Sequence, residues 1–295
     1  MATEPQDTGG RIAVIGAGAI GGTLAAWLAQ THAVTVCART PLVDLEVETP
    51  ERTIRATPAI LTDPAQATPV DWVLATTKTY DCAAAAAWLP GLMGPDMRLA
   101  VIQNGVEQRE RFPMVPPERT VPVIIDLPAE RTAPGRIVQR RDGTILVPEG
   151  EACEAFVALF ARTVIDAKTT PDFATAAWRK LAINCSGIVS AITRRAAEVA
   201  NDEGVAEVMR GLVRECVAVG RAEGATLPDR LVDQVVEWTR KAHPDSVNSL
   251  HADFVAGRPM ELDARNGVIV RLGAKHGIET PLNRAMAALL AASAK

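Results

Sequence analysis

The sequence predicts an α/β protein in which a doubly wound parallel sheet is followed by an all-helical domain. From Arg11 to Thr163, short apolar strand patterns alternate with helical patterns, which is typical of a mostly parallel sheet covered by helices on both faces. Beyond Asp172 the strand patterns stop and long helical patterns follow one another. A glycine-rich turn directly after the first strand is the third observation. We therefore expect a disordered tail at 1–10, a first domain at 11–167 and a helical domain at 168–295.

The glycine-rich turn predicts a dinucleotide-binding site. Gly16 permits the tight turn, Gly18 lets the backbone approach a pyrophosphate, and Gly21 lets the following helix pack closely. The surrounding segments have the required order of strand, helix and strand, at 12–15, 20–30 and 33–38. This context predicts a Rossmann-type domain whose cofactor contacts Gly16, Gly18, Ala19, Ile20 and Gly21. A glycine turn that binds no ligand is the alternative.

The end of the second strand indicates which nucleotide would bind. An NAD site usually has Asp or Glu there for the ribose hydroxyls, whereas an NADP site has an Arg for the 2′-phosphate. Arg39 directly follows this strand, and the next acidic residue is Asp44. Arg39 follows Gly21 at close to the usual offset of about 20 residues, so we predict NADPH as the cofactor. The alternative is that Arg39 is an ordinary solvated surface side chain.

Composition excludes several other classes of protein. The 295 residues are 48% hydrophobic and 22% charged, which is typical of a globular protein with room for two cores. No apolar run reaches the roughly 18 residues that a membrane span needs, and the N-terminus does not resemble a signal peptide, so a cytoplasmic location is expected. The net charge of −4, without a basic block, argues against nucleic acid as the partner.

Neither cysteine nor histidine spacing predicts a metal site. The five cysteines are dispersed among apolar neighbours, and none forms a C-x-x-C pair. The four histidines do not cluster in the sequence either. We expect buried thiols in a reducing compartment, with no disulfide and no structural metal.

The remaining elements follow from apolar periodicity and turn residues. In the first domain we expect strands at 70–76 and 98–103, a helix at 80–89 closed by Pro90-Gly91, and a helix at 151–163. Strand-like segments at 121–126, 136–139 and 144–147 predict a partly antiparallel extension of the sheet, and 166–171 has no periodic signal. The helices expected in the second domain lie at 172–194, 203–223, 228–241, 263–276 and 281–294, with Pro228 and Pro281 in first turns.

Polar residues after strands and within apolar helices are candidates for chemistry. Lys78 and Asn104 follow two predicted strands, at the edge where α/β sheets bind ligands. Lys180 and Asn184 lie one turn apart on one face of an otherwise apolar helix. Partial burial lowers the pKa of a lysine ammonium in general, which suits a proton donor near neutral pH. The alternatives are a snorkelling or exposed lysine and a turn asparagine.

A second group of polar residues surrounds a predicted helix start. Ser249 and Asp253 precede Glu261 and Asp263 in the segment that leads into the helix at 263–276. Asp263 is interpreted as a helix cap, because acidic residues commonly cap first turns. Glu261 lies between apolar neighbours before that cap, so it is a functional candidate.

Five ordered motifs resemble the ketopantoate reductase family from Arg11 to about Leu290. They are GAGAIG at 16–21, TKTYD at 77–81, QNGVE at 103–107, WRKLxxN at 178–184, and SLxxD at 249–253 with GRPxExD at 257–263. Together these motifs are far more specific than the glycine turn alone.

The resemblance implies reduction of a 2-oxo acid, 2-dehydropantoate or a related ketone, to the D-2-hydroxy acid with NADPH, as in pantothenate biosynthesis. It implies that Lys180 is the general acid and that Glu261 orients Lys180 or the substrate. Asn104, Asn184 and Ser249 would bind the substrate, while Lys78 and Asn104 would also lie near the nicotinamide. The family further implies a monomer or a homodimer.

Three departures from the family pattern bear on the substrate. After Asn184 the chain reads Cys185-Ser-Gly where the family usually has a second Asn followed by Pro. Ser246 replaces a frequent Asn, and 193–197 replaces a later Asn-Gly pair. Loss of such groups redirects specificity, so 2-dehydropantoate is hypothesised to be a poorer substrate than a less hydroxylated or bulkier oxo compound. A reductase of similar build acting on another carbonyl or an imine, and a non-catalytic NADP(H) sensor, are the alternatives.

Overall fold

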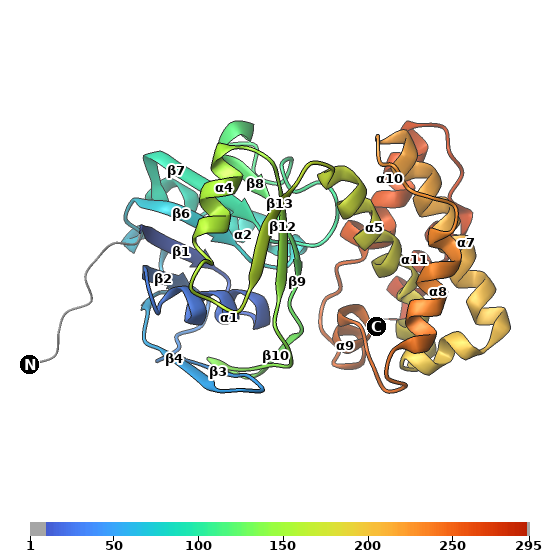
Figure 1. Cartoon of the computed structure of the whole chain (residues 1–295), viewed down its shortest axis with the longest axis horizontal. Helices are drawn as coiled ribbons and strands as arrows, with labels where there is room; N and C mark the ends of the chain where they lie inside the picture. The colour runs from blue at the N-terminus through green and yellow to red at the C-terminus, as the bar shows by residue number, and fades with distance from the viewer. Residues whose placement is uncertain (1–9, 294–295) are drawn as a thin grey trace, which may run out of the picture. The chain divides into compact units, whose positions relative to one another are not determined.

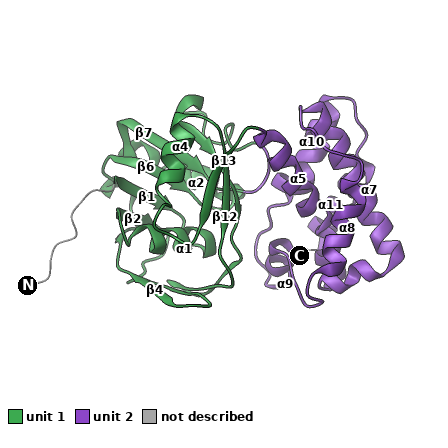
Figure 2. Ribbon diagram, viewed as in Figure 1, with its two compact units in different colours: residues 1–103, 107–171 green, residues 104–106, 172–295 purple. Residues whose placement is uncertain are grey.

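The computed structural model describes residues 10–293, which fall into two compact units (Figures 1 and 2). Unit 1 contains 1–103 and 107–171, and unit 2 contains 104–106 and 172–295. The expected tail lies outside the described residues, apart from Gly10. The boundary between the two units falls after Pro171, whereas the sequence predicted a domain boundary after position 167.

Unit 1 is built on a six-stranded sheet in which every neighbouring pair is parallel. The strand order is β5-β2-β1-β6-β7-β8. The strands are β1 (Arg11–Ile15), β2 (Ala33–Cys37), β5 (Ala59–Leu61), β6 (Val70–Ala75), β7 (Met93–Val101) and β8 (Thr120–Pro122). The chain therefore winds outward from β1 in one direction and then outward from β6 in the other, which confirms the predicted Rossmann-type sheet.

The central strand β1 is buried on both faces, as its continuous apolar sequence requires. Successive side chains of a strand point to opposite faces. Ile12 and Val14 accordingly belong to one hydrophobic core, together with helix α1 (Ala19–Leu28) and helix α4 (Glu151–Ala158). Ala13 and Ile15 belong to the core on the other face. Helices thus cover both faces of the sheet (Figure 1).

Two smaller sheets complete unit 1. One has the order β10-β11-β3-β4, with β10 (Ala129–Ala133), β11 (Arg136–Gln139), β3 (Leu45–Glu48) and β4 (Thr53–Ala56). The other has the order β13-β12-β9, with β13 (Asp166–Thr170), β12 (Thr144–Pro148) and β9 (Ile124–Asp126). The first small sheet packs against α1, where the indole Nε1 of Trp27 donates a 2.9 Å hydrogen bond to Oε1 of Gln139.

Several sequence-based predictions for unit 1 were wrong in detail. The segments at 124–148 form separate small sheets, so they do not extend the main sheet. The segment 166–170, which shows no apolar periodicity, is the edge strand β13, because backbone pairing with β12 needs no apolar pattern. The helix expected at 80–89 is divided into η2 (Thr79–Asp81), α2 (Cys82–Ala86) and α3 (Leu89–Leu92), since Pro90 begins a new turn. Helix α4 also ends earlier than expected.

All regular secondary structure among the described residues of unit 2 is helical, as predicted. Its helices are α5 (Phe173–Ser186), α6 (Ile188–Thr193), α7 (Glu203–Ala222), α8 (Leu231–Lys241), α9 (Ser249–Val255), α10 (Val268–Lys275) and α11 (Pro281–Ser293). Gly187 separates α5 from α6, and α8 begins three positions after Pro228. Pro281 is the first residue of α11, as expected. The short helix α9 was not predicted.

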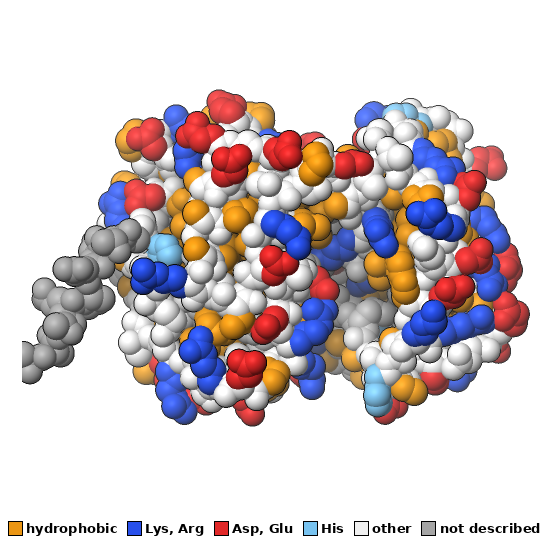
Figure 3. All heavy atoms as spheres, in the orientation of Figure 1, with side chains coloured by type: hydrophobic (Ala, Val, Ile, Leu, Met, Phe, Trp, Pro, Cys, Tyr) orange, Lys and Arg blue, Asp and Glu red, His pale blue; other side chains and the backbone are white. Residues whose placement is uncertain are grey.

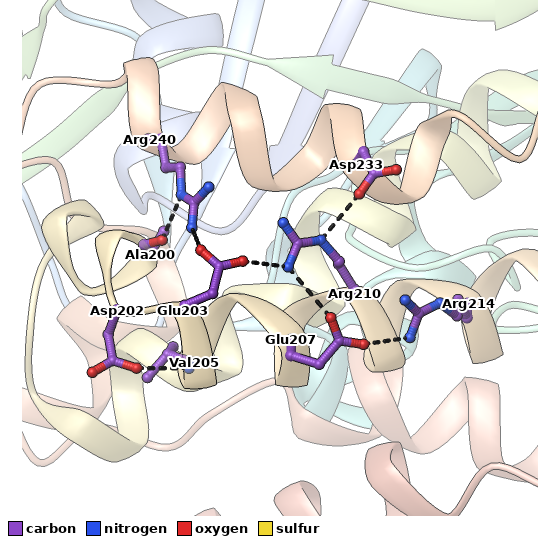
Figure 4. Close-up of polar contacts among 9 residues, drawn as sticks. All are labelled: Ala200, Asp202, Glu203, Val205, Glu207, Arg210, Arg214, Asp233 and Arg240. Carbon is purple, nitrogen blue, oxygen red and sulfur yellow. Dashed lines mark hydrogen bonds and ion pairs between the residues drawn. The ribbon is translucent and has the colours of Figure 1, made fainter.

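An ion-pair network joins α7 to α8 on the surface of unit 2 (Figure 4). The guanidinium of Arg210 contacts Glu203 at 2.9 Å, Asp233 at 3.0 Å and Glu207 at 3.3 Å. Glu203 also contacts Arg240 at 2.7 Å. These hydrogen bonds, first that from Arg210 and then that from Arg240, lower the pKa of Glu203.

Charged side chains of both signs are interspersed on the face of the molecule shown in Figure 3. Between residues 10 and 293, none of the helices combines the length and the apolar character that a membrane crossing requires.

Candidate active site

The strand order of unit 1 reverses between β1 and β6, and ligands of open α/β sheets bind beyond the carboxyl ends of the strands at such a point. The glycine-rich turn follows β1, and Thr76 to Lys78 follow β6. The hydroxyl of Thr76 lies 2.9 Å from the carbonyl oxygens of both Ile15 and Gly16, so it joins the two strand ends. Thus the two segments predicted to bind the cofactor lie side by side.

The three glycines of the turn differ in what the structure requires at each position. Gly16 has a φ of 106°, in the region that favours glycine, and its N–H donates to the carbonyl of Cys37 at 2.9 Å. A Cβ on Gly21 would lie 2.0 Å from the carbonyl oxygen of Gly16 and 2.2 Å from Oγ1 of Thr76. Gly18 differs, because a Cβ there would meet no atom within 4 Å. The space beside Gly18 is therefore open, while Gly16 and Gly21 are needed by the fold itself.

Helix α1 begins at this open space without a capping side chain. Gly18 is the N-cap and offers no side-chain acceptor, and the first turn contains no acidic residue. Helix N-termini attract phosphate through their unpaired N–H groups and the positive end of the dipole. The backbone at Gly18, Ala19 and Ile20 therefore suits the pyrophosphate of a dinucleotide.

Arg39 lies two residues beyond the end of β2 and its side chain is 81% exposed. Its Nη2 is 3.4 Å from Oδ2 of Asp81, in a weak surface ion pair. The guanidinium is thus available at the carboxyl edge of the sheet, where a 2′-phosphate would require it. Lys78 is half-buried; it lies three residues after β6 and is the N-cap of η2.

In unit 2, α5 positions the Lys180 and Asn184 side chains. Asp172 caps the start of the helix, because its carboxylate accepts a hydrogen bond from the N–H of Thr175 at 3.1 Å. Lys180 and Asn184 are both half-buried, one turn apart, whereas Leu181 between them is buried. They therefore share one helix face at the margin of the hydrophobic core.

The structure brings two further candidates into direct contact. The side-chain amide of Asn104 donates a 3.0 Å hydrogen bond to Oε2 of Glu261. Glu261 is only 5% exposed, and a buried carboxylate requires such partners. Asn104 belongs to unit 2 by its contacts, although it lies within the sequence of unit 1.

Ser249 is held by the residue that precedes it. The side-chain oxygen of Asn248 caps α9 by accepting from the N–H groups of Leu250 and His251 at 3.0 and 3.1 Å. The amide of Asn248 donates to the carbonyl of Gly187 at 2.9 Å, and a Cβ on Gly187 would lie 2.8 Å from that amide nitrogen. The capping residue thus fastens the start of α9 to the junction of α5 and α6.

Sequence reasoning missed Arg265, which bridges two of the candidates. Its Nη2 donates to the backbone carbonyl of Asn184 at 2.7 Å, and its Nη1 lies 3.4 Å from Oγ of Ser249. Arg265 is 2% exposed and occupies the π-helical turn η5 (Asp263–Gly267). Burial lowers the pKa of its guanidinium to about 10.

The predicted cap at Asp263 was wrong. The carboxylate of Asp263 pairs with Arg271 at 2.6 Å, and no side chain caps this helix start. The reason is the π-helical turn, which places Asp263 one turn before α10 and on the same side as Arg271. Asp253 pairs with Arg258 at 2.9 Å.

The environments of the cysteines bear on the sequence-based prediction of no disulfide and no structural metal. All five cysteines are free thiols, and four of them are buried. Burial raises the pKa of the Cys37 thiol to about 12. Within residues 10–293, no group of three or more His, Cys, Asp and Glu side chains is arranged to hold a metal ion.

Comparison with known proteins gives a consistent answer over both units. Residues 12–152 match the family described as "Ketopantoate reductase PanE/ApbA", and residues 172–294 match its C-terminal region. A 2-dehydropantoate 2-reductase of Caulobacter vibrioides is 61% identical over 96% of this chain and 99% of its own length. The chain belongs to the ketopantoate reductase family. It is accordingly an enzyme, an oxidoreductase, and the family implies a nicotinamide cofactor.

More distant relatives agree with this family assignment. The 2-dehydropantoate 2-reductase of Mycobacterium tuberculosis is 39% identical over 96% of this chain and 97% of its own. The crystal structure of a ketopantoate reductase from Ralstonia eutropha has a TM-score of 0.89 at 30% identity, covering 96% of this chain and 98% of that one. A D-mandelate dehydrogenase at 20% identity has a TM-score of 0.84 and shares the fold.

Proposed function

We propose that this member of the ketopantoate reductase family reduces 2-dehydropantoate to the D-2-hydroxy acid with NADPH, as a cytoplasmic enzyme of pantothenate biosynthesis. The observation that carries the proposal is the 61% identity, over nearly the full length of both chains, to a protein named for that activity. The hydrogen bond between Asn104 and the buried Glu261 supports it, because both belong to the motifs from which the activity was inferred.

NADPH would be held by groups at the carboxyl edge of the main sheet. Gly16, Gly18, Ala19, Ile20 and Gly21 would bind the pyrophosphate, in agreement with the open space at Gly18 and the uncapped start of α1. Arg39 would bind the 2′-phosphate, while Lys78 and Asn104 would lie near the nicotinamide. When bound, NADPH supplies the hydride that reduces the carbonyl carbon of the substrate.

The residues of unit 2 would manage the charge that develops on the substrate oxygen. As the carbonyl carbon is reduced, its oxygen becomes negative, and a nearby cation stabilises it. Nζ of Lys180 would donate the proton to that oxygen. Glu261 would orient Lys180 or the substrate, and Asn104 in turn restrains Glu261 at 3.0 Å.

Asn184, Ser249 and Asn104 would bind the polar groups of the substrate. The Asn248 cap holds Ser249 in position, α5 carries Asn184, and the 3.0 Å hydrogen bond to Glu261 holds Asn104. The departure at Cys185 to Gly187 favoured a different oxo compound on the sequence alone, but the 61% identity to a protein named 2-dehydropantoate 2-reductase favours 2-dehydropantoate as the preferred substrate. We expect a monomer or a homodimer, which size-exclusion chromatography with light scattering distinguishes.

The test is a steady-state assay of the purified enzyme with NADPH and a panel of 2-oxo acids, in which oxidation is followed by nicotinamide absorbance. We expect 2-dehydropantoate to be reduced with the highest kcat/KM of the panel. A higher value for a less hydroxylated oxo acid would keep the chemistry and change the substrate. Binding of NADPH without turnover of any carbonyl compound would contradict the proposal and favour a sensor.

A further inference from the structure

Arg265 is a buried cation that lacks a counter-charge in direct contact. It is 2% exposed, and it takes part in none of the ion pairs found in the described part of the chain. Its Nε is buried without a hydrogen-bond partner. A guanidinium in such a place is costly unless charge or hydrogen bonds compensate for the lost water.

Its two contacts satisfy only part of its donor capacity. The 2.7 Å bond to the carbonyl of Asn184 is a favourable one, because that carbonyl lies in the last turn of α5, at the negative end of the helix dipole. The 3.4 Å contact with Oγ of Ser249 is long and weak. A guanidinium has five N–H donors, so a role confined to supporting α5 leaves most of them unused.

The negative groups nearest to Arg265 are engaged elsewhere. Glu261 and Asp253 lie close enough to raise the pKa of the guanidinium, against the larger lowering by burial. Glu261 however accepts from Asn104, and Asp253 pairs with Arg258 at 2.9 Å. Neither carboxylate forms an ion pair with Arg265, so its charge is available for an anionic ligand.

The backbone around Arg265 is irregular and firmly held. A π-helical turn is rare, and such turns often occur at functional sites. Asn266, the next residue, is fully buried and donates to the carbonyl of Cys185 at 3.1 Å and to Oδ1 of Asn283 at 2.9 Å. These contacts fix the turn against α5 and α11, which keeps Arg265 in place without an ion pair.

Arg265 therefore joins the backbone of Asn184 to the hydroxyl of Ser249, and all three side chains keep unused hydrogen-bonding capacity. The side-chain amide of Asn184 has no hydrogen-bond partner among residues 10–293, and the only one of Ser249 Oγ there is Arg265 itself. Ser249 is exposed at the start of α9, so this cluster reaches the surface of unit 2. Asn184 and Ser249 are also the residues proposed to bind the substrate.

We propose that Arg265 binds the carboxylate of the 2-oxo acid, with Ser249 and Asn184 as additional hydrogen-bond donors. This rests on the proposed function, and it adds the reason why the enzyme would select an acid over a neutral carbonyl compound. Arginine matches the geometry of a carboxylate with two parallel N–H donors. The substrate carboxylate would thereby supply a counter-charge in direct contact with Arg265, which Glu261 and Asp253 do not.

The experiment compares 2-dehydropantoate with its neutral lactone on the wild-type enzyme and on Arg265→Gln. We expect kcat/KM for the acid to fall by about 10- to 100-fold, mainly through KM, because a charge-assisted hydrogen bond is lost. The value for the lactone should change by less than about 3-fold. Isothermal titration of the D-2-hydroxy acid and its lactone gives the same comparison without turnover, and we expect only the acid to bind more weakly.

Two control variants distinguish a loss of carboxylate binding from a loss of folding stability. Arg271→Gln removes an arginine of α10 that pairs with Asp263, and should leave both substrates unaffected. Arg265→Lys keeps the positive charge and should recover part of the affinity for the acid, which a purely structural loss would not allow. Thermal unfolding of each variant reports on any damage to unit 2.

Equal losses for acid and lactone, or no loss for either, would overturn the role of Arg265 while leaving the proposed function intact. A wild-type enzyme that reduces neither compound but binds NADPH would overturn the proposed function, and the carboxylate role with it.

Discussion

The side-chain amide of Asn104 donates to Oε2 of Glu261 over 3.0 Å, although one residue follows β7 and the other precedes the last two helices. Glu261 is 5% exposed, so this bond compensates part of the cost of burying its carboxylate. Two candidate residues from different motifs are thus coupled in the structure. Their effects on catalysis should be coupled as well.

A double-mutant cycle tests this coupling. Asn104→Ala and Glu261→Gln should each lower kcat/KM, and the double variant should lose less than the two single losses combined. We expect an interaction energy of about 0.5–3 kcal/mol, typical of residues in direct contact. Asn201→Ala, an exposed asparagine of unit 2, is the control. If the losses of the two single variants add up exactly in the double variant, Asn104 and Glu261 act independently and the coupling is refuted.

Lys180→Ala should remove the proton donor while sparing the cofactor. We expect turnover to fall by about 10²- to 10⁴-fold, the usual contribution of a general acid, with NADPH binding nearly unchanged. Steady-state assays and fluorescence titration measure the two quantities. Lys241→Ala serves as the matched control, because this lysine is exposed at the end of α8. Normal turnover in Lys180→Ala would remove Lys180 from the mechanism.

Arg39→Ala should change the choice of nucleotide. Loss of a charge-assisted contact to the 2′-phosphate should weaken NADPH binding by about 10- to 100-fold and NADH binding by less than about 2-fold. Asp81→Asn removes the carboxylate that lies 3.4 Å from Arg39, so NADPH binding should become slightly stronger. Equal weakening of both nucleotides by Arg39→Ala would refute the assignment.

Two glycine substitutions separate the needs of the fold from those of the cofactor. Gly21→Ala places a Cβ 2.0 Å from a backbone oxygen, so it should destabilise unit 1 by about 1–3 kcal/mol or more in urea unfolding. Gly18→Ala meets no atom within 4 Å and should leave the midpoint unchanged, while it weakens NADPH binding. A stable Gly21→Ala protein with normal cofactor affinity would contradict this reading of the turn.

The Arg210 network predicts a specific dependence of stability on pH. The pKa of Glu203 is lowered by hydrogen bonds from Arg210 and Arg240, and that of Glu207 by hydrogen bonds from Arg214 and Arg210. Folded-state pKa values below the unfolded ones stabilise the protein above the unfolded value of about 4.3, and this is lost as pH falls through the folded values.

Arg210→Ala should therefore be less stable than the wild type at pH 7, and the difference should shrink as pH is lowered from about 5 to 3. Thermal unfolding monitored by circular dichroism across that range measures it. For Lys241→Ala, at the exposed end of α8, the difference in Tm from the wild type should not shrink as pH falls. A difference in Tm that stays constant down to pH 3 would show that the network does not contribute through these carboxylates.

Periodicity in the sequence was sufficient for the central strands of the main sheet, but not for its edge strand β5 or for the two smaller sheets. The strands β1, β2 and β6 are buried and apolar, so their sequences report their structure. The strand β13 reads DAKTT and is partly exposed, because it is defined by backbone pairing with β12. Such pairing depends on segments distant in the sequence, which local patterns do not reveal.

The candidate site likewise contains residues that the sequence revealed and one that it did not. Lys180, Asn184 and Glu261 interrupt apolar patterns, and this made them visible in the sequence. Arg265 stayed unnoticed, because an arginine beside an asparagine is typical of a solvent-exposed helix face. Its burial follows from the π-helical turn, which sequence patterns do not predict.

The loop at 104–106 also bears on how this protein can be divided or recombined. The three residues count with unit 2, so the polypeptide enters that unit, returns to unit 1, and enters it again at Asp172. A fragment that begins at Asp172 would lose the amide that bonds Glu261, together with Val106, which packs on the core of unit 2. The helical unit is thus not a separable module, and chimaeras between relatives would have to exchange this loop along with the C-terminal half.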